Sequence, residues 1–203
     1  MRSVILLIRH AMTDAVGVRL TSRQPGVLLN VSGLGQVDEM CHHLRDVPLA
    51  AVYSGPLERT LATAAPIAAT HALEVRTLDG LNEVDFGEWT GLTFAQLSTL
   101  PDWRAFNDFR AGANVPGGER AADVQHRIIT ALSDLERRHA GEVIAAVSHG
   151  DVIRAAVLHV TATPLNLWHR FEISPASITT IAYDDGNPRL LAVNDVPGRL
   201  AHQ

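Results

Sequence analysis

The chain has 203 residues, of which 46% are hydrophobic and 19% charged, as expected of a globular protein with a sizeable core. Its formal net charge is −5 and it has no basic run, which argues against a nucleic-acid partner. The single cysteine, Cys41, excludes an internal disulfide and argues against a cysteine-based metal site.

The first predicted element is a strand at residues 4–8, where five apolar residues stand in a row. Such a run is typical of a strand buried on both faces. It is interrupted by Arg9 and His10, is too short to span a membrane and lacks the layout of a signal peptide. We therefore expect a cytoplasmic protein with no membrane partner.

Helical and strand patterns alternate through the middle of the chain. A loop at 12–31 precedes a helix whose apolar residues recur every three or four positions. The further predicted elements are a strand at 50–53, a helix opened by 54–56 and ending near 69, a strand at 73–78, a loop at 80–91, one or two short helices over 94–109 broken near Pro101, a turn at 116–119 and a long helix ending near 140.

The last third of the chain repeats the strand–helix pattern. It predicts a strand at 142–147, a helix at about 152–160 and two strands at 178–183 and 189–193, joined by a hairpin-like turn. Strands that alternate with helices favour an α/β fold with a mostly parallel sheet. No linker or repeat is visible, so we expect a single domain over residues 1–203.

Three of the predicted buried strands end in chemically unusual residues. The first ends at Arg9 and His10, the second leads to Arg59, and a later one ends at Ser148 and His149. Ligands of open α/β sheets bind beyond the carboxyl ends of parallel strands, where helix N-termini and guanidinium groups favour anions. Arg59 also opposes the helix dipole in a first turn, a local cost that suggests a function.

These motifs resemble the histidine phosphatase superfamily, the phosphoglycerate mutase-like group, and in particular its small bacterial phosphatases. The resemblance covers roughly residues 3–160 and implies a three-layer α/β sandwich with helices on both faces of the sheet. The segments that carry it are Arg9-His10, 54–60 (SGPLERT), 81–91 (LNEVDFGEWTG), 116–119 (PGGE) and 148–150 (SHG).

The resemblance implies a metal-independent phosphomonoesterase that needs no cofactor and acts on a small phosphorylated metabolite. His10 would attack phosphorus to form a phosphohistidine, while Arg9, Arg59 and His149 hold the phosphoryl oxygens. Glu83 would protonate the leaving oxygen and then activate water. Asp85 and Glu88 are rivals for that role because they lie in the same loop.

The loop after the first strand should border the phosphate. Thr13, Ser22 and Arg23 are therefore candidate phosphate- or substrate-binding residues, although each also suits an ordinary loop position. Farther along, Trp103, Phe106 and Phe109 recur at a spacing near three. That spacing predicts either a helix face packed on the core or a lid over the site.

Ala11 stands where the family most often has glycine, and its methyl group could keep the backbone from the phosphate. A phosphate-binding protein with weak catalysis is therefore one alternative function. A phosphoglycerate-type phosphomutase is another, disfavoured because no asparagine follows the Arg-His motif before Asn30. A phosphoprotein phosphatase is disfavoured because no docking segment is visible. The oligomeric state is open, and a homodimer is one possibility.

Overall fold

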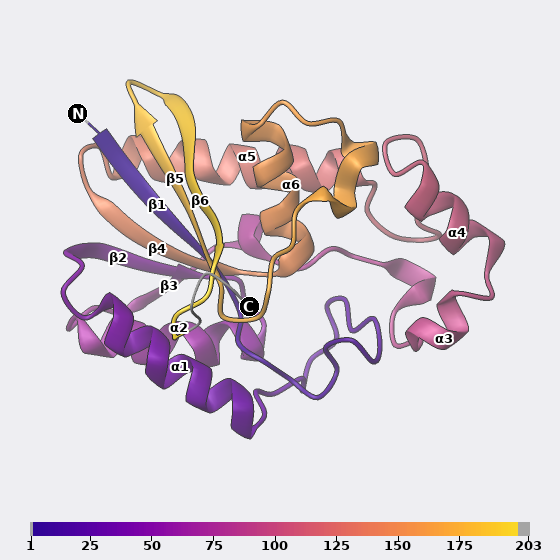
Figure 1. The fold of residues 1–203 in the computed structure, drawn as a ribbon, viewed down its shortest axis with the longest axis horizontal. Coiled ribbons are helices and arrows are strands. Elements are labelled where there is room, and N and C mark those ends of the chain that lie inside the picture. Colours follow the sequence, from indigo (N-terminus) through magenta and orange to yellow (C-terminus); the bar gives the residue numbers. More distant parts are fainter. Residues whose placement is uncertain (1, 199–203) are drawn as a thin grey trace.

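A six-stranded sheet runs through the middle of the computed structural model, which describes residues 2–198 (Figure 1). The strand order is β3-β2-β4-β1-β5-β6. The first four strands in that order are mutually parallel, whereas β5 and β6 run antiparallel to their neighbours, so the predicted mostly parallel sheet is confirmed. The strands are β1 (Arg2–Arg9), β2 (Leu49–Ser54), β3 (Val75–Thr77), β4 (Val143–Ser148), β5 (Ile178–Asp184) and β6 (Asn187–Asp195).

Helices cover both faces of the sheet, which confirms the predicted three-layer sandwich (Figure 1). Because side chains alternate along a strand, Leu7 faces one helical layer and Ile8 the other. The layer on the Ile8 side holds α1 (Val31–Leu44) and α2 (Glu58–Thr70). The layer on the Leu7 side holds α5 (Ala121–Arg138) and α6 (Gly150–Val160).

A separate helical segment lies to one side of these layers and consists of α3 (Phe94–Leu97) and α4 (Pro101–Asp108) (Figure 1). Trp103 and Phe106 of α4 each stack edge-on against Trp89, with ring centroids 5.3 Å apart in both pairs. Phe109 lies outside this packing and is 58% exposed, because it follows the last turn of α4. The predicted packed face is therefore correct for two of its three aromatic residues.

Several boundaries differ from those expected. The strand predicted at 73–78 shrinks to the three residues of β3, and the helix expected from about 152 begins already at Gly150. Three short 3-10 helices, η1 (Asp79–Leu81), η2 (Gly87–Trp89) and η3 (Leu165–Arg170), were not predicted. Within residues 2–198 no helix combines the length and apolar character needed to span a membrane.

Candidate active site

The carboxyl ends of β1, β2 and β4 meet at one edge of the sheet, as their register requires. Arg9 is paired with Ser148, and Ser54 with Val147, so the residues that follow these strands lie side by side. The His10 and His149 rings stand edge to face, with centroids 5.2 Å apart. His10 lines a cavity of about 180 Å³ together with Arg9 and Glu83. The predicted site residues Arg59 and His149 are buried and do not line it themselves.

The tautomer of His10 is fixed by the backbone carbonyl of the next residue, and its charge state is set mainly by burial. Its Nδ1 lies 2.8 Å from the carbonyl oxygen of Ala11, and a carbonyl can only accept, so Nδ1 carries the proton. Burial, reinforced by the positive charges of Arg9 and Arg59, lowers the pKa of His10 to about 3. The ring is therefore neutral above that pH, with a lone pair on Nε2.

Ala11 is compatible with this arrangement. Its side chain is fully buried in the apolar cluster between the sheet and α1–α2. Its amide donates to Thr63 Oγ1 at 3.0 Å, and its carbonyl accepts from His10. The methyl group thus packs in the core.

Two buried guanidinium groups lie beside the His10 ring. Arg9 donates through Nη1 to the carbonyl of Ile173 at 2.5 Å, and Arg59 donates through Nη2 to the carbonyl of Ser22 at 2.7 Å. Arg9 Nε and Arg59 Nη1 are buried without a hydrogen-bond partner among residues 2–198. Buried cationic donors of this kind are costly unless they bind an anion.

Gly150 allows Arg9 to approach the first turn of α6. A Cβ atom on this residue would lie 3.1 Å from Arg9 Nε and 3.2 Å from Cζ, closer than most side-chain contacts. Glycine here therefore lets the guanidinium lie against the N-terminus of the helix.

Glu83 lines the cavity, and the buried His149 ring lies next to it. His149 is completely buried, and burial followed by the charge of His10 lowers its pKa. Glu83 Oε2 lies 3.4 Å from His149 Nδ1, without hydrogen-bond geometry. Burial, and next the negative charge of Asp151, raise the pKa of Glu83 to about 7, against the opposing effect of Arg59. Glu83 can therefore hold or release a proton near neutrality.

The Glu83 loop is fixed by an arginine that the sequence did not single out. Arg127 of α5 donates to the carbonyls of Gly80, Asn82 and Glu83 at 2.8–3.0 Å and pairs with Glu119. Glu119 also accepts from the amide of Asp85. We call this set of contacts from Arg127 and Glu119 to the Glu83 loop the brace. The sequence pointed to it only through Glu119, which belongs to the PGGE segment.

The three loop candidates have different surroundings. Thr13 is buried at the cavity wall, and its hydroxyl has no hydrogen bond to another of residues 2–198. The Ser22 hydroxyl donates to the Val84 carbonyl and accepts from the Phe86 amide, both at 2.9 Å, so it braces the Glu83 loop.

Arg23 does not line the cavity. Its Nε donates to the Glu83 carbonyl at 2.8 Å, and its Nη2 lies 2.9 Å from a Glu119 carboxylate oxygen. The structure therefore brings Thr13 and Ser22 to the cavity, although the Ser22 hydroxyl is already hydrogen-bonded within the protein, and it leaves Arg23 outside the cavity lining. Among residues 2–198 no cluster of His, Cys, Asp and Glu side chains is arranged to hold a metal ion.

Two cavity residues of α6 were not predicted. Asp151 and Arg154 form an ion pair at the cavity wall, and Asp151 also accepts from the indole of Trp168 at 3.2 Å. Asp151 directly follows the SHG segment, and this position was the sequence signal that could have identified it as a cavity residue. Trp168 belongs to η3, which has too little periodicity to be recognised in the sequence.

Comparisons with known proteins agree with this geometry. The chain is 29% identical to phosphoserine phosphatase 1 of Hydrogenobacter thermophilus, over 94% of this chain and 91% of that one. It is 32% identical to a metal-independent phosphoserine phosphatase of Arabidopsis thaliana, over 77% and 68% of the two chains. The structure of a histidine-to-alanine mutant of an Entamoeba histolytica phosphoserine phosphatase, in complex with phosphoserine, superposes with a TM-score of 0.88 at 27% identity, covering 98% of this chain and 100% of that one. The family model of the histidine phosphatase superfamily, branch 1, matches residues 5–196, and the chain belongs to that family.

Proposed function

We propose that this phosphomonoester hydrolase works through a covalent phosphohistidine on His10 and needs no metal ion. The observation that carries the proposal is the state of His10: a neutral ring with Nδ1–H bound to a carbonyl and Nε2 unprotonated, beside buried arginines that have unused donors. A nucleophile, an anion clamp and a proton donor are the parts that phosphoryl transfer needs.

In the first step His10 Nε2 attacks the phosphorus of a bound monoester. The bond from phosphorus to the ester oxygen breaks, and its electron pair leaves with that oxygen. Arg9, Arg59 and His149 stabilise the charge on the transferring phosphoryl group. Glu83 gives its proton to the leaving oxygen, which departs as an alcohol.

In the second step water attacks the phosphohistidine. Glu83, now a carboxylate, takes a proton from the water as the new bond to phosphorus forms. The bond from phosphorus to Nε2 breaks, its electron pair returns to the ring, and inorganic phosphate leaves. Both His10 and Glu83 are then in their starting states. The raised pKa of Glu83 suits a group that alternates between acid and base.

The relatives named above act on phosphoserine, which supports a small phosphorylated metabolite as substrate. The test incubates the protein with an aryl phosphate and with 3-phosphoglycerate in the presence of a chelator. We expect release of inorganic phosphate from both, without isomerisation of 3-phosphoglycerate. Isomer exchange would indicate the phosphomutase alternative, and turnover no higher than that of a His10→Ala variant would overturn the enzymatic mechanism.

A further inference from the structure

The cavity has a second wall whose side chains make no direct contact in the proposed phosphoryl transfer. Beyond the buried clamp, it is lined by Asp151 and Arg154 of α6, by the exposed Arg19 and by Phe94. Because these residues line the same cavity as His10 and Glu83, a leaving group held in the cavity would lie among their charges. The charges on this wall can therefore select among leaving groups.

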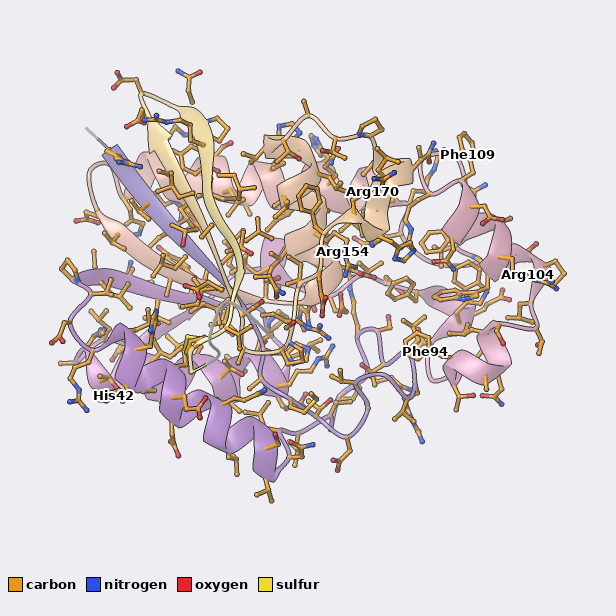
Figure 2. All side chains as sticks on the ribbon, in the orientation of Figure 1. His42, Phe94, Arg104, Phe109, Arg154 and Arg170 are labelled. Atoms are coloured by element: carbon orange, nitrogen blue, oxygen red, sulfur yellow. The ribbon has the colours of Figure 1, made fainter. Side chains whose placement is uncertain are left out.

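Arg154 is held rigidly, with one donor nitrogen unused. Its Nε donates to the carbonyl of Phe171 at 2.9 Å, and its Nη1 pairs with Asp151 Oδ1. Its Nη2 is accessible to solvent and has no hydrogen bond to any of residues 2–198. Figure 2 shows Arg154 near the centre of the molecule, whereas Arg104 projects from the outer side of α4. Because the side chain is already fixed, binding an anion through Nη2 costs little further conformational entropy.

Asp151 presents an unused acceptor next to that donor. Both Arg154 and the Trp168 indole bind its Oδ1, and its Oδ2 has no hydrogen bond to another described residue. Burial would raise the pKa of Asp151, but Arg154 and then Arg110 outweigh it and hold the pKa below its ordinary value. The carboxylate is therefore ionised, and it favours a cationic donor over a neutral one.

We infer that this wall is a subsite for an α-amino acid: Arg154 Nη2 binds the carboxylate of the leaving group and Asp151 Oδ2 binds its ammonium group. The inference rests on the proposed function and specifies its substrate class as phosphorylated amino acids. Arg19, at the mouth of the cavity, adds a second positive charge toward the carboxylate. A neutral or purely cationic leaving group would leave Arg154 Nη2 without an anionic partner.

Three matched esters test the subsite. Phosphoserine carries both charged groups, phosphoethanolamine lacks the carboxylate, and 3-phosphoglycerate replaces the ammonium group with a hydroxyl. We expect kcat/KM to be highest for phosphoserine, with each missing charged contact costing about 10- to 150-fold. An aryl phosphate serves as the substrate that reports the chemistry without the subsite.

Variants then assign the contacts. Arg154→Ala should lower the ratio of kcat/KM for phosphoserine to that for phosphoethanolamine by about 10- to 150-fold, and Arg154→Lys should restore part of it. Asp151→Asn should lower the ratio of phosphoserine to 3-phosphoglycerate, because any effect on Glu83 is common to both esters. The matched control is Arg104→Ala, an exposed arginine of α4 that should change neither ratio.

The outcomes separate the two proposals. Equal kcat/KM values for the three esters would overturn the subsite and leave the proposed function standing. So would Arg154→Ala and Arg154→Lys variants in which kcat/KM falls by the same factor for every ester. Absence of turnover with every ester, the aryl phosphate included, would overturn both. If Arg154→Ala selectively loses turnover of phosphoserine but still hydrolyses the aryl phosphate above the His10→Ala level, the result would support both the subsite and the proposed function.

Discussion

Replacing Glu83 by glutamine removes the proposed proton donor while preserving its size. The amide retains a hydrogen-bonding group of similar shape but cannot protonate a leaving oxygen. An alkyl phosphate needs that proton because an alkoxide is a poor leaving group, whereas an aryl phosphate releases a stable phenolate. The Glu83→Gln variant should therefore slow the two substrates very differently.

The structure sets the magnitude of the effect. With the pKa of Glu83 raised to about 7, about half of the side chain is protonated at pH 7; at its ordinary value of 4.5 the protonated fraction would be roughly 0.3%. Burial and Asp151 together thus enrich the acid form by two orders of magnitude. Loss of general acid catalysis should lower kcat for alkyl phosphates by about 10²–10⁴, and far less for aryl phosphates.

The assay measures kcat and kcat/KM for one alkyl and one aryl phosphate from about pH 4 to about pH 9. This range spans the ordinary pKa values of carboxyl groups and histidine, which lie at about 4–7. Wild-type kcat/KM for the alkyl ester should fall tenfold per unit above pH 7, because only the protonated carboxyl acts as acid. That limb should vanish in Glu83→Gln. Glu88→Gln, in the same loop but exposed, is the matched control. Equal slowing of both esters, or a limb that persists, would assign the donor to Asp85 or Glu88.

Four further outcomes are expected. His10→Ala should form no acid-labile phosphoenzyme after rapid acid quench with labelled substrate; a labelled protein would move the nucleophile elsewhere. Asp151→Asn should shift the alkaline limb for alkyl phosphates below pH 7, since removing a neighbouring negative charge lowers the pKa of Glu83; an unmoved limb would contradict the coupling. Arg59→Ala should reduce kcat by on the order of 10²–10³, and a smaller loss would mean that Arg59 is structural. Arg127→Leu should lower the free energy of unfolding in urea by about 2–4 kcal/mol through three lost carbonyl contacts, and a change under about 1 kcal/mol would refute the brace.

The residues that converge on the cavity were predictable because they follow strand ends. Arg9 and His10 follow directly on a run of buried apolar residues, His149 follows another such run after Ser148, and parallel strands place these positions together. Arg59 was recognisable because it opposes the dipole of its own helix, and the structure places it in the first turn of α2 with 1% exposure.

What could not be predicted depends on loop conformation. Ser22 adopts a left-handed backbone with φ of 49°, which turns its hydroxyl toward the Glu83 loop, and no sequence pattern specifies that turn. Arg23 similarly extends to Glu119, which is 96 positions farther along the chain. Pairings between distant loops leave no periodic signal. The same holds for Trp168, which reaches Asp151 from the short helix η3.

The bond from His10 Nδ1 to the carbonyl of Ala11 has an evolutionary consequence. Side-chain substitutions at position 11 leave the carbonyl in place, so the tautomer of His10 does not depend on which side chain stands there. Many enzymes orient a catalytic histidine with a carboxylate that a single mutation can remove. Here the orienting group is part of the main chain. Position 11 can therefore vary among side chains that fit in the core. The tautomer of the proposed nucleophile is thereby protected against mutation of the side chain at the neighbouring position.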